Sequence, residues 1–309
     1  MPRKKYLVVI GGPTASGKTK AAIKIANHFG VEIISADSRQ FYREMNIGTA
    51  KPSKLELDAA PHHFINNLSI HDTYTAGDYE REVIPFLDNL YESYDMAILA
   101  GGSGFFIQAV IEGLDDFPKV PKEVRAKIEE EFQLHGIKPL REKVRAIEPE
   151  YFEVMDNKNP HRLIRVLSVY EASGQPFSSF LYQSPKIRNF EPIFIYLEMR
   201  RDYLYNRINN RVEKMINKGL IDEAYELYPF RHLTPLQTVG YKEIFAYYDG
   251  TISKRKAIDL IKQNTRRYAK RQTTWFRKKS YWNSFYAKDP EAMIKFISLK
   301  LMKDLELGG

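Results

Sequence analysis

The chain has 309 residues, of which 43% are hydrophobic and 28% charged, and this composition is typical of a globular protein with a sizeable core. It contains no cysteine, which excludes disulfides, thiolate metal sites and cysteine nucleophiles. No apolar run approaches the roughly 20 residues of a transmembrane helix, and residues 1–5 lead into a short apolar strand rather than a signal sequence. We expect a soluble, cytoplasmic protein without a membrane partner.

The formal net charge of +8 is concentrated in one segment. Residues 251–280 hold eleven lysines and arginines and a single acid, Asp259. A basic segment of this density is typical of a surface that binds a polyanion, and it is equally typical of a solvated helix face. Charge alone leaves both interpretations open.

The N-terminal third alternates between strand and helix patterns. Apolar runs at residues 6–10, 31–35 and 96–100 predict parallel strands buried on both faces, and residues 18–29 have helical periodicity. This alternation predicts an α/β fold with a doubly wound parallel sheet, in which ligands bind at the carboxyl ends of the strands. The expected site is formed by the loops that follow these strands, at residues 11–17, 36–40 and 101–104.

The middle of the chain has no convincing strand pattern. Between residues 116 and 190, prolines punctuate short charged helices, which predicts a helical insertion. The sheet pattern returns at residues 193–197, and a long helix over 202–218 and the basic helix follow it. We expect a core formed by residues 1–115 and 191–309, interrupted by a helical domain of residues 116–190.

Residues 12–19 match the phosphate-loop pattern G-x-x-x-x-G-K-T and lie between a predicted strand and a predicted helix. Glycines let successive backbone N–H groups wrap a phosphate, and the helix N-terminus adds its dipole. Lys18 supplies a cation, and the Thr19 hydroxyl can ligate Mg²⁺. A glycine-rich turn without function does not explain this pair. The predicted phosphate-binding residues are Gly12, Pro13, Thr14, Ala15, Ser16, Gly17, Lys18 and Thr19.

The sequence shows no hydrolysis apparatus to accompany this loop. The strand at residues 96–100 ends in Gly-Gly-Ser-Gly, without the acid with which nucleoside triphosphatases hold Mg²⁺. The guanine-reading pattern N-K-x-D is also missing. We therefore expect the loop to bind a phosphorylated ligand without hydrolysing it.

Asp37 follows the second predicted strand, at the edge of the sheet where the phosphate loop opens. A carboxylate there can act as a general base for a nucleophile aimed at the bound ligand. Asp37 and Gln40 are also spaced like a capping pair, so Asp37 can instead cap a helix. The spacing supports both interpretations equally.

Arg207 and Arg211 lie at i and i+4, on one face of the predicted long helix. Arginine is suited to bidentate contact with a diphosphate. An ion-pair lattice with Asp202 and Glu213 explains the same spacing. From spacing alone, the lattice is the preferred interpretation.

The basic helix carries two stripes with different expected roles. Lys262, Arg266 and Lys270 recur at i, i+4 and i+8 and are expected to face water or phosphate. A second stripe, which includes Tyr268 and Gln272, is expected to pack in the core rather than to stack on bases.

Two further patterns carry weaker signals. Arg162 and Arg165 lie near each other at the start of a helix led by proline, where they form either a nucleic-acid contact or a polar helix face. His62 and His63 are adjacent, so on an extended segment their side chains point to opposite faces, and no metal site is predicted.

Taken together, these motifs resemble those of the bacterial tRNA dimethylallyltransferases, also called tRNA isopentenyltransferases. The matching stretches occur in the order typical of that family and cover almost the whole chain. They are residues 12–19, 37–40, 47–52, 61–63, 101–104, 239–243 and 265–277. Many families share the phosphate loop, whereas the combination is specific to this one.

The resemblance implies transfer of a dimethylallyl group from dimethylallyl diphosphate to N6 of adenosine 37, in tRNAs that read codons beginning with U. In this family the phosphate loop holds the prenyl diphosphate, in agreement with the absent hydrolysis apparatus. Asp37 becomes the base that accepts the N6 proton. Lys18, Thr19 with Mg²⁺, and Arg211 stabilise the departing diphosphate. The family suggests a monomer, and no obligate protein partner is implied.

The resemblance also implies contacts with the tRNA anticodon stem-loop, on which the helical domain would close. Recognition would combine a splayed-out base with backbone contacts. The implied contacts are Asp37, Ser38, Arg39, Gln40, Ser103, Arg125, His161, Arg162, Leu163, Ile164, Arg165, Gln237, Thr238, Val239, Gly240, Tyr241 and Lys242.

Three other functions remain open at this point. A phosphate-loop kinase of a small metabolite would use Asp37 to activate a hydroxyl, but it leaves the basic helix unexplained. An RNA-binding protein with a purely structural phosphate loop would bind tRNA in a salt-sensitive way. A prenyltransferase of free adenine nucleotides shares the loop, but the insertion and the basic helix favour a macromolecular acceptor.

Overall fold

The computed structural model describes residues 4–181 and 186–307. The chain forms two compact units, one made of residues Met1–Glu112 and Ile187–Gly309 and the other of Gly113–Lys186. We call them the core unit and the helical unit and describe each by itself. The boundaries lie within four residues of those expected from the sequence.

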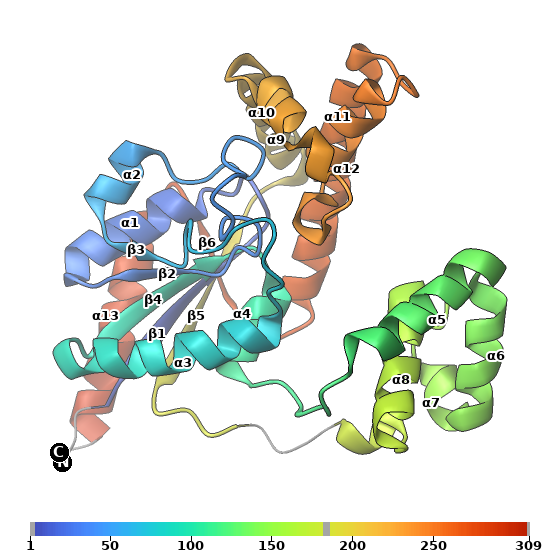
Figure 1. The fold of residues 1–309 in the computed structure, drawn as a ribbon. Helices are drawn as coiled ribbons and strands as arrows, with labels where there is room; N and C mark the ends of the chain where they lie inside the picture. The colour runs from blue at the N-terminus through green and yellow to red at the C-terminus, as the bar shows by residue number, and fades with distance from the viewer. Residues whose placement is uncertain (1–3, 182–185, 308–309) are drawn as a thin grey trace. The chain divides into compact units, whose positions relative to one another are not determined.

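The core unit is built on a six-stranded sheet in which every strand pair is parallel. Its strand order is β3-β2-β4-β1-β5-β6, so β1 lies inside the sheet (Figure 1). This confirms the predicted α/β fold with a parallel sheet. The strands are β1 (Tyr6–Gly11), β2 (Ile33–Ser35), β3 (His62–His63), β4 (Met96–Gly101), β5 (Glu191–Glu198) and β6 (Asn283–Tyr286).

Side chains of β1 alternate between two hydrophobic clusters, one on each face of the sheet. Leu7 and Val9 pack in one cluster, and Val8 and Ile10 pack in the other. The continuous apolar run of this strand therefore reflects burial on both faces. The first face is covered by α3 (Ala76–Ser93) and α4 (Gly104–Ile111), and the second by α1 (Lys18–Phe29) and α13 (Pro290–Leu307) (Figure 1).

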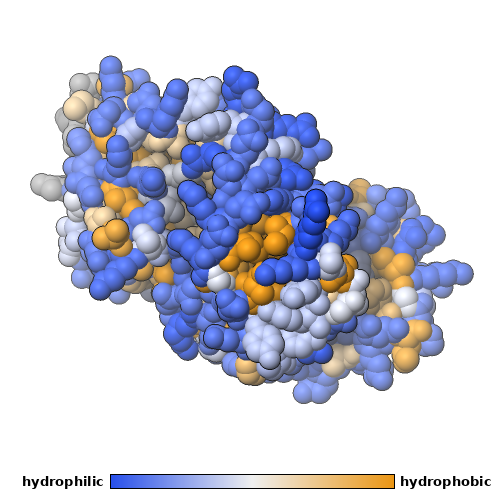
Figure 2. Space-filling model, turned by 90° about the horizontal axis from the view of Figure 1, so that it is seen from above, coloured by the Kyte–Doolittle hydropathy of each residue, from blue (hydrophilic) through white to orange (hydrophobic). Residues whose placement is uncertain are grey.

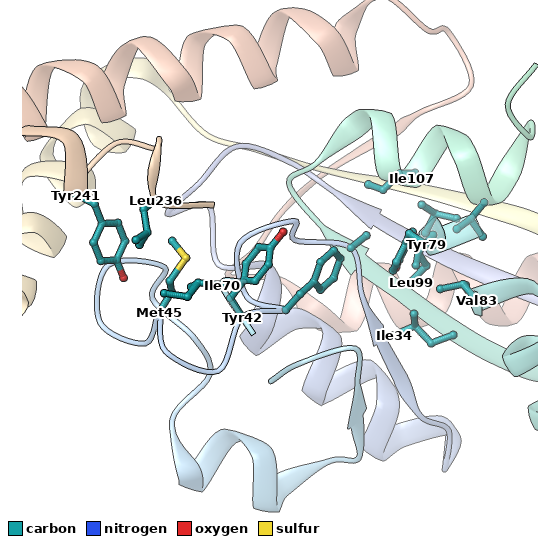
Figure 3. Close-up of a cluster of buried hydrophobic side chains, with 14 of the residues drawn as sticks. Ile34, Tyr42, Met45, Ile70, Tyr79, Val83, Leu99, Ile107, Leu236 and Tyr241 are labelled. Atoms are coloured by element: carbon teal, nitrogen blue, oxygen red, sulfur yellow. The ribbon is translucent and has the colours of Figure 1, made fainter. Parts of the chain in front are cut away.

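The remaining helices of the core unit lie beyond the carboxyl ends of the strands or beside them. The predicted long helix and the predicted basic helix are both present, as α9 and α12. Figure 3 shows Leu236 and Tyr241 lying beside Met45, which belongs to the loop after β2. These elements are α2 (Lys54–Ala59), α9 (Arg201–Asn217), α10 (Leu220–Leu227), α11 (Tyr241–Tyr248), α12 (Lys254–Arg277) and the 3₁₀ turns η2 (Tyr228–Phe230) and η3 (Thr234–Leu236).

The helical unit has its own hydrophobic core, which includes Leu140, Phe152 and Leu163. The Asn159 side chain caps its fourth helix by accepting a hydrogen bond from the His161 N–H, 3.1 Å away. The short helices predicted here are confirmed. They are α5 (Lys122–His135), α6 (Ile137–Ile147), α7 (Pro149–Val154), α8 (Pro160–Ser173) and the 3₁₀ turn η1 (Phe177–Phe180).

The surface seen in Figure 2 is mostly hydrophilic, with hydrophobic residues gathered in separate patches. In the part of the chain that the structure describes, no helix is both long and apolar enough to cross a membrane.

Candidate active site

The loop after β1, predicted from the sequence to bind phosphate, contains three residues with positive φ angles. Gly12, Ala15 and Gly17 have positive φ angles of 153°, 64° and 103°. Ala15 is the unusual member, because a side chain disfavours this conformation. The neighbouring Ser16 is fully buried, and its hydroxyl has no hydrogen-bond partner among the described residues. Such turns let successive N–H groups converge on an anion.

Lys18 begins α1 and is held against its own loop. Its Nζ donates hydrogen bonds to the carbonyl oxygens of Gly12, at 3.0 Å, and Pro13, at 2.9 Å. Burial lowers the pKa of Lys18 to about 8, while the charge of Asp37 raises it and that of Arg211 lowers it further. The carboxylate of Asp37 and the cations of Lys18 and Arg211 therefore interact electrostatically at this loop.

Two arginines of α9 contact the same loop. Arg211 Nη1 lies 3.2 Å from the Thr14 hydroxyl, and Arg207 Nε donates to the Ala15 carbonyl at 2.8 Å. Burial lowers the pKa of Arg211, and the nearby charge of Asp37 opposes that shift. The α9 arginines therefore bring positive charge to the phosphate loop.

The ion-pair lattice preferred from spacing is wrong. Asp202 pairs with Arg200, and Glu213 pairs with Lys262 of α12. Neither acid is a partner of the two arginines that contact the loop. The lattice fails because tertiary packing directs Arg207 and Arg211 to the loop after β1 and brings Lys262 of α12 to Glu213.

Asp37 follows β2 and caps a turn rather than a helix. Its Oδ1 accepts a hydrogen bond from the Arg39 N–H at 3.1 Å, and no α-helix begins at this position. The helix-capping interpretation is therefore wrong. Asp37 is half-buried, and its charge raises the pKa of both Lys18 and Arg211.

The loops after β2 and β4 are joined to each other. The Ser38 N–H donates to the Ser103 hydroxyl at 3.0 Å, and the Ser103 N–H donates to the Ala36 carbonyl at 3.2 Å. A Cβ on Gly101 would lie 2.1 Å from that carbonyl oxygen, so this position requires glycine. Asp37 thus lies between Ala36 and Ser38, each of which is hydrogen-bonded to Ser103.

Helix α12 packs against these loops. The residues that face them, Tyr268 and Gln272, belong to the stripe that was expected to pack in the core. Tyr268 remains 37% exposed, and its hydroxyl is beside Ser103. Burial and the charge of Asp37 raise the pKa of Tyr268 to about 12. The buried amide of Gln272 bonds to both Gly102 and Thr14. The core prediction for these two residues was therefore incomplete.

The cationic stripe of α12 is only partly exposed. Lys262 pairs with Glu213 of α9, and Arg266 donates to Asn209 Oδ1 at 2.6 Å. Lys270 is exposed. The expectation that all three cations face water or phosphate is wrong for the first two, because α9 packs along that side of the helix.

Gln40 and Lys51 organise the loop that follows Asp37. The Gln40 amide donates to the carbonyls of Thr49 and Ala50, both at 3.3 Å. Lys51 Nζ donates to Asn46 Oδ1 at 3.0 Å and to the Tyr42 carbonyl, and burial lowers its pKa to about 8. The Gln40 side chain therefore stabilises the loop by hydrogen bonds within it.

Glu223 of α10 is a residue that sequence reasoning missed. Its carboxylate accepts N–H groups of residues 46–48 at 2.7 to 3.0 Å and the Tyr241 hydroxyl at 2.6 Å. A Cβ on Gly48 would lie 2.5 Å from the Tyr241 ring. A lone glutamate on a helix gives no sequence signal for such a role.

The predicted tRNA contacts at residues 237–242 differ in exposure. Gln237 and Lys242 are exposed, and Thr238 and Val239 are half-buried. Tyr241 is fully buried, so its side chain has a structural role, and the tRNA contact expected at this position stays a prediction. Gly240 is also buried, with φ at +104° at the start of α11.

The helical unit presents some of its predicted contacts and buries others. His161, Arg162 and Arg165 are exposed on α8. Leu163 and Ile164 are buried in the core of the unit, because they occupy the opposite face of that helix. Their side chains stabilise the fold, and the RNA contacts expected at these two positions stay predictions. The remaining residue, Arg125 of α5, pairs with Glu129 at 2.8 Å.

Comparison with known proteins identifies the family. A family model described as IPP transferase matches residues 40–279. The chain belongs to the IPP transferase family. The tRNA dimethylallyltransferase of Christiangramia forsetii is 53% identical over 273 residues, covering 88% of this chain and 90% of that protein. The tRNA dimethylallyltransferase of Flavobacterium johnsoniae is 46% identical, covering 95% of this chain and 97% of that protein.

Solved structures show the same architecture. The tRNA isopentenylpyrophosphate transferase of Bacillus halodurans is 35% identical, with a TM-score of 0.73, and the match covers 99% of each chain. The loops described above are therefore set in the fold of an IPP transferase.

In this IPP transferase, a divalent cation has one suitable protein ligand at the phosphate loop. The Thr19 side chain is half-buried and forms no hydrogen bond with residues 4–181 or 186–307. The same described residues contain no group of three His, Asp or Glu side chains that could hold a metal ion. This donor set fits Mg²⁺, which keeps several waters and binds through one or two protein ligands together with substrate phosphates.

Proposed function

We propose that this IPP transferase moves a dimethylallyl group from dimethylallyl diphosphate to N6 of adenosine 37 in the anticodon stem-loop of tRNAs that read codons beginning with U. The observation that carries the proposal is the juxtaposition of Asp37 with Lys18 and Arg211 at the end of the parallel sheet. It provides a proton acceptor beside cations suited to a diphosphate. The names of the relatives support the same reaction.

The phosphate loop would hold the diphosphate of the prenyl donor. Lys18, Arg207 and Arg211 supply positive charge from two elements. The strand β4 ends at Gly101 and is followed by Gly102 and Ser103 rather than by an acid, so this strand does not supply the residue that positions Mg²⁺ for hydrolysis of a nucleoside triphosphate. A donor that is cleaved by an incoming nucleophile suits this arrangement.

In the reaction, N6 of adenosine forms a bond to C1 of the dimethylallyl group while the bond from C1 to the diphosphate oxygen breaks. The bonding electrons leave with diphosphate, and Asp37 accepts the proton from N6. Lys18 and Arg211 stabilise the negative charge that develops on the leaving group. Mg²⁺, held by Thr19 together with the diphosphate, would add charge stabilisation at the same oxygens.

The acceptor would be held by the loops beside Asp37 and by exposed cations of α12 and α8. Lys270 and Arg271 are exposed on α12, and Arg162 is exposed on α8. Lysine and arginine side chains neutralise RNA phosphates and give salt-dependent binding. A tRNA substrate agrees with the cytoplasmic localisation expected from the sequence.

The test is an assay with purified protein, Mg²⁺, unmodified tRNA and either dimethylallyl diphosphate or ATP, followed by nucleoside mass spectrometry. We expect dimethylallyladenosine only with the prenyl donor and only at adenosine 37. A matched tRNA that has guanosine at position 37 serves as the control. Prenylation of free adenine nucleotides but not of tRNA, or phosphate transfer from ATP, would replace the proposal with one of the alternative reactions.

A further inference from the structure

The buried amide of Gln272 joins two loops that have different tasks in the proposed reaction. Gln272 Oε1 accepts the Thr14 N–H of the phosphate loop at 2.8 Å. Its Nε2 donates to the Gly102 carbonyl, also at 2.8 Å, in the loop after β4. One side chain of α12 therefore links the loop that would hold the donor to the loop beside Asp37.

The surroundings of Gln272 leave it little freedom to move. The residue is only 7% exposed, and a Cβ on Gly102 would lie 2.5 Å from its Nε2. One turn before it, Tyr268 is beside Ser103, and one turn after it, Trp275 packs where a Cβ on Gly104 would lie 2.4 Å from its ring. Three side chains on one face of α12 thus fit against the loops.

The two hydrogen bonds of Gln272, which we call the bridge, require both the oxygen and the N–H of a carboxamide. An ionised glutamate can accept the Thr14 N–H but has no donor for the Gly102 carbonyl, and leucine offers neither. Burial makes each unmade hydrogen bond costly. Glutamine is the residue type whose single side chain satisfies both loops at this length.

We propose that Gln272 is a positioning residue that fixes the separation between the phosphate loop and the loop beside Asp37, and hence between prenyl donor and acceptor nitrogen. The inference rests on the proposed function, because the separation matters only if both substrates react there. Displacing reacting groups by about 1 Å lowers a rate by about 10²-fold. The residue acts through the two loops and contacts neither substrate.

The kinetic test compares Gln272→Leu with the wild type in the tRNA prenylation assay. We expect kcat to fall by about 10²-fold while KM for each substrate stays within about threefold. Gln263→Leu makes the same change at an exposed position of the same helix and should leave kcat unchanged. Thermal unfolding of each variant identifies any loss of folded protein. A kcat within threefold of wild type in folded Gln272→Leu would overturn the proposal.

A second variant separates positioning from a general loss of packing. In Gln272→Glu, a protonated carboxyl restores the donor for the Gly102 carbonyl, and burial favours the protonated form. The ratio of its kcat to the wild-type value should rise as the pH is lowered from 8 to 6. Gln263→Glu should show a constant ratio. A constant ratio in Gln272→Glu would contradict the role of the donor half.

Amide hydrogen exchange tests the bridge without any reaction. Exchange of the Thr14 amide should be at least about tenfold faster in Gln272→Leu than in the wild type, because this N–H loses its acceptor. Unchanged exchange there would overturn the bridge whatever the assay shows. Failure of the wild type to prenylate tRNA, with faster exchange in the variant, would instead overturn the proposed function and retain the bridge.

Discussion

The cations of the phosphate loop differ in burial from those of the helical unit. Lys18 and Arg211 are held among backbone and hydroxyl groups, and burial lowers the pKa of each. Arg162 of the helical unit is exposed on α8. The attraction between opposite charges is stronger where water is excluded. The buried cations therefore suit a reacting diphosphate, and the exposed ones suit an RNA backbone that has to bind and dissociate.

Asp37→Asn should cause the largest loss of kcat. The amide keeps an oxygen that can accept the Arg39 N–H, so the turn is preserved, but it cannot accept the N6 proton. We expect kcat to fall by about 10² to 10⁴-fold and tRNA affinity to stay within about twofold. Single-turnover prenylation and filter binding measure the two quantities. Normal turnover would remove Asp37 from the proton transfer.

Arg211→Gln should produce the next largest loss. Without the guanidinium, the negative charge on departing diphosphate loses a buried partner, and kcat should fall by about 10² to 10³-fold. The matched control is Arg201→Gln, an exposed arginine at the start of the same helix, which should keep kcat within about twofold. Equal losses in both variants would attribute the effect to α9 as a whole rather than to the loop contact.

The titration of Lys18 should appear in the pH dependence of donor capture. The pKa of Lys18 is about 8 in the free protein, and a diphosphate favours the charged ammonium. Above pH 8, kcat/KM for dimethylallyl diphosphate should therefore fall about tenfold per pH unit.

Lys18→Arg carries a charge that does not titrate in this range. Its profile should stay flat above pH 8 even if its absolute rate is lower. Lys51, whose pKa is also about 8, provides the competing explanation. A fall that persists in Lys18→Arg would assign the titration elsewhere.

The helical unit should show the smallest effects. Arg162→Gln removes one exposed charge, so KM for tRNA should rise about twofold to fivefold with kcat unchanged, and the slope of log affinity against log salt should decrease by about one. Lys138→Gln, at an exposed position of α6, is the matched control. Equal salt slopes for Arg162→Gln and the wild type would remove Arg162 from the RNA interface.

The buried strands of the fold were predictable, including the three-residue β2, and the two edge strands were not. β1, β4 and β5 contain the predicted apolar runs, whose apolar character comes from cover on both faces. β3 has two residues and β6 has four, and neither is buried along its length. Such edge strands form because a neighbouring strand offers hydrogen bonds, and their sequence carries no hydrophobic pattern.

The residues of the site also fall into a predictable group and an unpredictable one. The phosphate loop was predictable because its turn, its lysine and its helix are consecutive in sequence. Arg211 meets Thr14 across 197 residues, and Gln272 meets it across 258. Contacts at such separation depend on how α9 and α12 pack, which periodicity does not encode, so the ion-pair lattice was preferred in error and the Gln272 bridge was missed.

The two hydrogen bonds that tie Lys18 to its loop have a thermodynamic consequence. An ammonium has three donors, and the carbonyls of Gly12 and Pro13 take two of them. One N–H remains, aimed by the other two. A free lysine loses roughly 2 kcal/mol of rotamer entropy when it is immobilised, and here that loss is incurred when the protein folds. The donor therefore meets a directional group rather than a flexible charge, and its binding need not order the side chain.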